Sequence, residues 1–248
     1  MFLKTSLLVS LLLLVTALIH PGPWSGQPEQ NLPCGEDTFE NAIKNVYESL
    51  HEPALNPDAF HIAMLGFRSL CLKGLVIKDS LITVIDFSLP SSEDRFFVID
   101  LLRNKVIYKT LVAHGRNSGE LYATRFSNKA QSHQSALGFY ITGNPYQGGQ
   151  GYSMLLTGVD TGYNDQARIR SIVVHSASYA THQYIKQYGR LGRSFGCPAL
   201  PPRVNTKIIN LIKEGSVLFS YYPDKVYLDG SPVLGSLSEE NPAIRPVL

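Results

Sequence analysis

An excess of positive charge is the first feature that this sequence lacks. Its 22 lysine and arginine residues are nearly matched by 20 aspartate and glutamate residues, which leaves a formal net charge of +2 at pH 7. The basic residues are scattered and interleaved with acidic ones, whereas a nucleic-acid footprint requires clustered lysine and arginine. We therefore expect no nucleic-acid partner for this protein.

Long apolar runs are absent beyond the N-terminus, so the rest of the chain predicts no transmembrane helix. At the N-terminus, Lys4 precedes the apolar run 6–19, which a histidine, two prolines and a glycine then end. This order is typical of a secretory signal peptide, which we place at residues 1–22. The sequence thus predicts an exported protein of the periplasm or cell envelope, with no stable membrane span after signal cleavage. No clear cleavage site follows, so an uncleaved anchor is the alternative.

Cysteine is scarce as well, and the three residues of this type are Cys34, Cys71 and Cys197. In an oxidising compartment cysteines tend to pair, and an odd number leaves one thiol free. Cys34 and Cys71 share the N-terminal region, so we expect a disulfide between them and a free thiol at Cys197. The alternative is that Cys71 is a buried core residue on one face of a helix.

Close pairs of metal-binding residues are missing too. A zinc site needs three or four ligands, usually with spacings such as CxxC or HxxxH. His175 and His182 form no such pair, and Cys197 has no cysteine nearby. We therefore expect neither a metal ion nor another cofactor.

The N-terminal part of the chain predicts a linker followed by two helices. Residues 23–35 are rich in Pro, Gly, Gln and Asn, which is typical of a linker. In the region 36–78, apolar residues recur at helical spacing. We expect the second helix to begin after the cap Asn56 and the first-turn Pro57.

Residues 79–228 have a different pattern, in which short runs of β-branched and aromatic residues alternate with turn residues. We expect a mainly β fold with flanking helices (α+β), an antiparallel β-sandwich or barrel with a small N-terminal helical preface. Two helices are expected within it, at about 179–188 and 205–214. Residues 229–248 are polar and punctuated by proline, which predicts a flexible C-terminal tail.

Reactive side chains concentrate in the segment 171–201. His175 ends an apolar strand, and Cys197 follows in the run Arg-Ser-Phe-Gly-Cys-Pro. A thiol nucleophile requires a base close by, and an imidazole can supply it. Gly196 allows a sharp turn that can aim backbone N–H groups at an oxyanion, and Ser194 can donate a hydrogen bond to the substrate or to the histidine. A cysteine is more often a small buried hydrophobe, but Gly, Arg and Pro surround this one.

Several segments between residues 81 and 222 match one known family in both order and spacing. They are TVIDFS, RFFVIDL, VAHG, SALGFYITG, GYSMLLTG, IVVHSASY and GRLGRSFGCPALP. These segments resemble the murein L,D-transpeptidase catalytic domain family, a branch of the YkuD-type cysteine transpeptidases. The resemblance implies a β-rich fold, a cysteine acyl-enzyme and peptidoglycan stem peptides as substrate. His175 fills the position of the family's histidine, and Ser194 to Cys197 fill its S-x-G-C loop.

One position departs from the wider family, which usually has an arginine two residues after the cysteine, where this chain has Ala199. A substrate carboxylate must then be held by another residue. Arg193 is the preferred candidate, with Arg190 and Arg203 as alternatives, because arginine suits bidentate recognition of carboxylates.

Two further residues are candidates for the same cleft. His114 ends a strand, so it can either line the cleft or bond a neighbouring loop. Tyr179 can form a wall of the substrate groove, although packing in the core is the usual role of an aromatic side chain.

Three functions follow as hypotheses. The leading one is L,D-transpeptidation by a monomer, in which an acyl group on Cys197 passes to an amine of a second stem peptide and cross-links the wall. In an L,D-carboxypeptidase, the acyl group passes to water instead. The third is a non-catalytic wall-binding protein that retains the fold, which the departure at Ala199 favours.

Overall fold

The computed structural model describes residues 36–235. The expected signal peptide and linker, Cys34 and the end of the expected tail lie outside these residues. Within the described range, no helix is both long enough and apolar enough to cross a membrane.

Two helices precede the sheet and confirm the predicted helical preface. They are α1 (Glu36–Leu50) and α2 (Pro57–Leu72). The Asn56 side chain caps α2 by accepting hydrogen bonds from the N–H groups of Asp58 and Ala59, at 2.8 and 3.4 Å. The cap and the proline that follows it therefore start the helix where the sequence predicts.

Eight strands form one sheet in the order β3-β2-β1-β8-β4-β5-β6-β7. Their bounds are β1 Leu81–Asp86, β2 Phe96–Asp100, β3 Lys105–Thr110, β4 Gly138–Gly148, β5 Gly151–Gly158, β6 Val173–Ser176, β7 Ala199–Leu200 and β8 Val217–Tyr221. Most neighbours are antiparallel, but β1 pairs with β8 in parallel, and so does β6 with β7. The α+β class is therefore confirmed, with two parallel contacts that the sequence pattern did not predict.

The sheet comes close to closing on itself. Just after β3, Ala113 forms an antiparallel bridge with Ala199 at the opposite edge, in β7. The two residues exchange backbone hydrogen bonds of 2.9 and 3.4 Å. The result is a nearly closed barrel, and the bridge brings the segment after β3 beside the loop that precedes β7.

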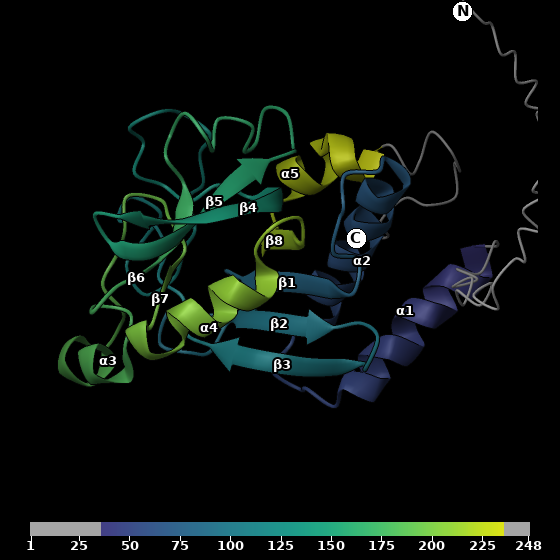
Figure 1. The fold of residues 1–248 in the computed structure, drawn as a ribbon, viewed down its shortest axis with the longest axis horizontal. Helices are drawn as coiled ribbons and strands as arrows, with labels where there is room; N and C mark the ends of the chain where they lie inside the picture. The colour runs from purple at the N-terminus through teal and green to yellow at the C-terminus, as the bar shows by residue number, and fades with distance from the viewer. Residues whose placement is uncertain (1–35, 236–248) are drawn as a thin grey trace, which may run out of the picture.

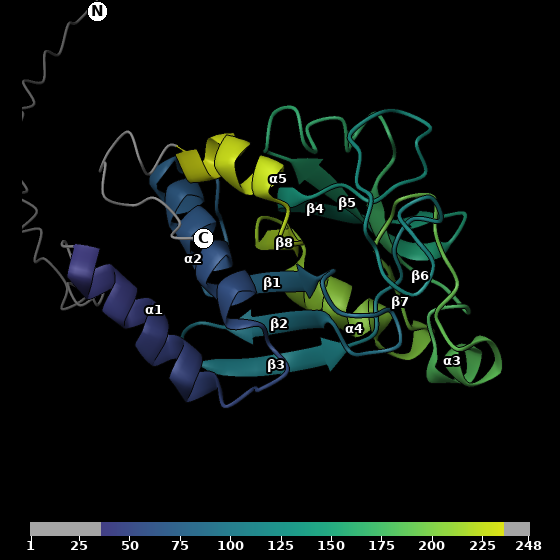
Figure 2. The ribbon, with the colours of Figure 1, turned by 180° about the vertical axis from the view of Figure 1, so that it is seen from behind.

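Alternation along the strands divides the core between two faces. In β2, Phe97 and Ile99 join the cluster under α1 and α2, whereas Phe96 and Val98 join the cluster that contains α4 (Pro202–Ile212). This is the two-residue period of a strand that is covered on both sides. Figures 1 and 2 show α2 and α4 on opposite faces of the strands β1 to β3.

The C-terminal segment packs against the barrel, contrary to the predicted flexible tail from residue 229. Helix α5 (Lys225–Gly230) is followed by the buried side chains of Val233 and Leu234. The buried carboxylate of Asp160 accepts hydrogen bonds from the hydroxyls of Tyr227 at 3.0 Å and Ser231 at 2.5 Å. These contacts hold residues 229–235 in place, and residues 236–248 lie outside the described range.

Candidate active site

Strand pairing brings Cys197 and His175 to one place. His175 lies in β6 opposite Ala199 of β7, and its N–H donates to the Pro198 carbonyl at 3.4 Å. Cys197 precedes β7 by two residues. The short helix α3 (His182–Tyr188) and the loop after it fill the sequence between them. The prediction that a strand-end histidine and a loop cysteine become neighbours therefore has a clear structural basis.

Both residues open onto the same cleft, which has a volume of about 370 Å³. Its wall includes His175, Tyr179, Arg193, Ser194, Phe195 and Cys197. Tyr179 thus lines the cleft, as one of its two predicted roles requires. A cavity of this size can accept part of a peptide chain beside the thiol.

The histidine is held in a single tautomer. Its Nδ1 lies 2.9 Å from the Ser176 carbonyl oxygen, which can only accept a hydrogen bond. Nδ1 therefore carries the proton, and Nε2 is left with a free lone pair. Burial lowers the pKa of His175, which the bond to Ser176 opposes only in part. The imidazole is therefore neutral at neutral pH, which is the state that a base requires.

The thiol of Cys197 is neutral at rest, as the imidazole of His175 is. It is partly buried, and its Sγ lies 3.5 Å from the Ser171 carbonyl oxygen. Burial raises the pKa of Cys197, while the N–H of Val173 and the charge of Arg170 act in the opposite direction. The resting pair is thus a neutral thiol and a neutral imidazole, so the thiol needs a base to become nucleophilic.

Ser194 and Gly196 shape the loop that carries the cysteine. The Ser194 hydroxyl donates to the Cys197 carbonyl at 2.6 Å and accepts from the Gly196 N–H at 3.0 Å. Ser194 is therefore engaged within the loop and makes no hydrogen bond to His175, which was one of the two roles predicted for it. The backbone N–H groups of Phe195 and Cys197 have no hydrogen-bond partner within residues 36–235, and that of Cys197, which belongs to the same residue as the thiol, can donate to an oxyanion.

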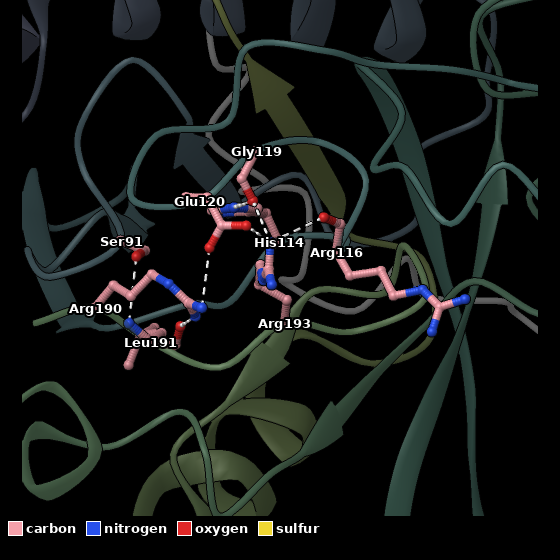
Figure 3. Close-up of polar contacts among 8 residues, drawn as sticks. All are labelled: Ser91, His114, Arg116, Gly119, Glu120, Arg190, Leu191 and Arg193. Carbon is pink, nitrogen blue, oxygen red and sulfur yellow. Dashed lines mark hydrogen bonds and ion pairs between the residues drawn. The ribbon is translucent and has the colours of Figure 1, made fainter. Parts of the chain in front are cut away.

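The predicted carboxylate anchors are already paired with an acidic residue. The Arg193 Nη1 donates to Glu120 Oε1 at 2.5 Å, and the Arg190 Nη2 lies 2.9 Å from Glu120 Oε2. Figure 3 shows Glu120 lying between the two guanidinium groups. Arg203, the third candidate, borders a separate cavity beside Pro201 and Pro202. Arg193 is therefore at the cleft as predicted, but its charge is largely offset.

His114 does not line the cleft, in contrast to its predicted role in substrate binding. It is 0% exposed, and its Nδ1 accepts from the Arg95 Nη2 at 2.7 Å, while Nε2 lies 3.2 Å from the Gly119 carbonyl oxygen. Burial, followed by the charge of Arg95, lowers the pKa of His114 to about 3. The alternative, a histidine that bonds a neighbouring loop, is the one that the structure supports.

Arg170 lies behind the cysteine loop and was not among the predicted site residues. Its guanidinium donates to the carbonyls of Ser127 and Gln134 and to the hydroxyl of Ser132. These partners are neutral, so its positive charge still acts on Cys197. An arginine before an apolar strand carries no sequence signal for this role.

Cys71 is the second cysteine within the described residues. Cys71 forms no disulfide with another residue of the range 36–235, burial raises the pKa of its thiol to about 11, and its expected partner Cys34 lies outside the described range. The disulfide therefore stays a prediction. Between residues 36 and 235, no three His, Cys, Asp or Glu side chains are grouped to hold a metal ion.

One comparison with known proteins identifies a family. The family model of the L,D-transpeptidase catalytic domain matches residues 51–221. No curated protein sequence matches this chain significantly.

Solved structures with a similar fold include two L,D-transpeptidases. The one from Mycobacterium smegmatis is 15% identical, with a TM-score of 0.35, over 58% of this chain and 59% of that chain. The one from Enterococcus faecium, solved as a mutant, is 12% identical, with a TM-score of 0.36, over 57% and 50%. The helical cell shape determining protein Pgp2 from Campylobacter jejuni is 13% identical, with a TM-score of 0.39, over 65% and 55%.

This chain thus spans between half and three fifths of the length of these three structures. The family model, by contrast, matches well over half of the chain itself. On that match, this protein belongs to the L,D-transpeptidase catalytic domain family.

Proposed function

We propose that this protein is a cysteine acyltransferase that cross-links peptidoglycan stem peptides, with Cys197 as nucleophile and His175 as base. The observation that carries the proposal is the fixed tautomer of His175 in the cleft that holds the thiol. Membership of a family that acts on peptidoglycan supports the substrate class and a location in the cell envelope.

The acylation step follows from this arrangement. His175 Nε2 takes the thiol proton as Sγ attacks the carbonyl carbon of the third stem residue. The negative charge that develops on the carbonyl oxygen is stabilised by the N–H of Cys197. The intermediate collapses by breaking the peptide bond to the terminal D-amino acid, and the imidazolium returns its proton to the leaving amine. The product is a thioester on Cys197.

The second step regenerates the enzyme. An amine of another stem peptide attacks the thioester carbonyl, and His175 takes the proton that this amine loses. The C–S bond breaks, the new amide is the cross-link, and the proton passes from His175 to the departing thiolate. In the alternative carboxypeptidase reaction, water replaces the amine and a tripeptide stem is released.

The test is incubation of the protein with disaccharide-tetrapeptide, followed by mass spectrometry of the products. A dimer lighter than two substrates by one D-amino acid supports transpeptidation, whereas a tripeptide product supports the carboxypeptidase. Cys197→Ala should abolish both, while Cys71→Ala, a substitution of the other described thiol, should retain activity. No product from the unmodified protein, together with measurable binding of the disaccharide-tetrapeptide, would support the non-catalytic wall-binding protein.

A further inference from the structure

The cations around the cleft differ in whether an acidic residue already pairs with them. Glu120 lies within ion-pair distance of both Arg190 and Arg193. An incoming carboxylate would have to compete with Glu120 for either guanidinium. The usual arginine after the cysteine is also absent, because Ala199 occupies that position.

Two arginines beside the same loop have no acidic partner among residues 36–235, the half-buried Arg170 and the exposed Arg116, and the side chain of Arg170 is occupied by neutral acceptors. The side chain of Arg116 is exposed, and among residues 36–235 no carboxylate lies within ion-pair distance of it. Its Nη2 bonds the His133 Nδ1 at 2.8 Å, and its guanidinium lies 4.7 Å from the centre of the Phe195 ring. Figure 3 shows its side chain extending away from Glu120, so that only its backbone joins that cluster.

The backbone of Arg116 is fixed to the cysteine loop. Its N–H donates to the Ser194 carbonyl at 2.8 Å, and its own carbonyl accepts from Arg193 at 3.1 Å. Gly115, the residue before it, forms a bridge with Ser194. Arg116 is therefore held at a constant position relative to the turn that carries Cys197.

Phe195 links the arginine to the cleft. It lies two residues before Cys197, lines the cleft and is 63% exposed. One neighbour of its ring is the Arg116 guanidinium and another is the His133 ring, whose centre is 4.7 Å away. Stacking of this kind orients a guanidinium while leaving its remaining N–H groups free to donate.

We propose that Arg116, oriented by Phe195 and His133, binds a carboxylate of the donor stem peptide at the rim of the cleft. The planar guanidinium keeps donors free for a bidentate contact, which is the geometry that a carboxylate prefers. This inference rests on the proposed function, because the donor carries carboxylates beside the bond that Cys197 attacks. Arg116 then replaces Arg193 as the residue that selects the charged substrate.

The experiment measures binding in the Cys197→Ala protein, so that no turnover is needed. The ligands are a stem tetrapeptide and the same peptide with its carboxylates amidated, and the method is calorimetry. Arg116→Ala should weaken binding of the tetrapeptide by about ten- to hundredfold, the loss expected for a charged hydrogen-bonded contact. Binding of the amidated peptide should not change, and Arg116→Lys should restore affinity only in part.

Arg125→Ala is the matched control, because Arg125 is an exposed arginine nine residues further along the same connection and has no side-chain partner within residues 36–235. It should leave both affinities unchanged. Equal weakening of both peptides by Arg116→Ala would overturn the proposal, as would an unchanged affinity for the tetrapeptide. Selective loss on Arg193→Ala instead would return the role to Arg193.

Failure of the proposed function has a different signature. If the unmodified protein forms no product yet Arg116→Ala still weakens tetrapeptide binding selectively, the reaction is wrong and the carboxylate site is right. If turnover is normal but binding and kcat/KM do not respond to Arg116→Ala, the reaction is right and this site is wrong.

Discussion

Replacing Gly196 with alanine tests whether the position of Cys197 depends on the backbone of its loop. Gly196 has a φ of +120°, which residues with a Cβ rarely adopt. A Cβ at this position would lie 2.7 Å from the Gln134 carbonyl oxygen and 3.2 Å from the Arg170 Nη2. The carbonyl has little freedom to withdraw, because the Arg170 guanidinium donates to it.

The structure sets the size of the effect. A strained backbone conformation costs about 1–3 kcal/mol, and an extra carbon in a packed site costs about as much again. If the loop keeps its shape, the free energy of unfolding should therefore fall by about 2–6 kcal/mol. If the loop relaxes instead, Cys197 moves, and a displacement of about 1 Å can lower the acylation rate on the order of a hundredfold.

The assay pairs urea unfolding with the rate of acylation by the tetrapeptide donor. Gly149→Ala is the matched control, since Gly149 also lines the cleft, but a Cβ added there would have no neighbouring atom within 4 Å and its φ is not in the left-handed region. That control should keep wild-type stability within about 0.5 kcal/mol and wild-type acylation. A Gly196→Ala protein that matches the wild type in both measurements would refute the argument.

Three further predictions concern the base, a buried histidine and the C-terminal contacts. His175→Ala should lower the acylation rate about a hundredfold or more, as stopped-flow measurements would show; a normal rate would exclude it as the base. His114 has a pKa of about 3 in the folded protein, so below about pH 6.5 the unfolded protein carries a proton on this histidine that the folded protein lacks. The free energy of unfolding should therefore fall by up to about 1.4 kcal/mol per pH unit as the pH drops from about 6.5. Urea unfolding at several pH values should show this slope, and His114→Asn should reduce it. Asp160→Ala should remove the acceptor of Tyr227 and Ser231 and destabilise the fold by about 1–3 kcal/mol, with faster hydrogen exchange in α5 as the specific sign.

Elements with a strong local pattern could be predicted from the sequence. Helix α2 has its cap at Asn56 and a clear apolar face, and the strands have dense β-branched runs. The order of the segment around Tyr227 and Val233 could not be predicted, because its apolar residues fall in two short groups that Asp, Gly, Ser and Pro separate. What holds it is Asp160, far away in the sequence, so that its order depends on a tertiary contact.

In the candidate site, too, features that depend on local sequence could be predicted, and features that depend on tertiary contacts could not. That Cys197 and His175 would share a cleft was predictable, because each residue type has its own chemistry and the motif has a fixed spacing. The ion pair of Arg193 could not be predicted, because its partner Glu120 lies 73 residues earlier and only the fold brings the two residues together. The place of Arg116 was not predictable for the same reason, since its exposure beside Phe195 depends on the bridge between Gly115 and Ser194.

The place of β8 in the sheet has a consequence for how the chain reaches its native state. β8 is the last strand to be synthesised, yet it lies between β1 and β4 and so joins the group β3-β2-β1 to the group β4 to β7. Until residues 217–221 are present, these two groups lack the strand between them, and two long open edges face water. Contacts of such long sequence separation form slowly, because loop closure must precede them. A nascent chain that ends before β8 should therefore have neither a stable barrel nor a formed cleft, and activity should appear only once synthesis has passed Tyr221.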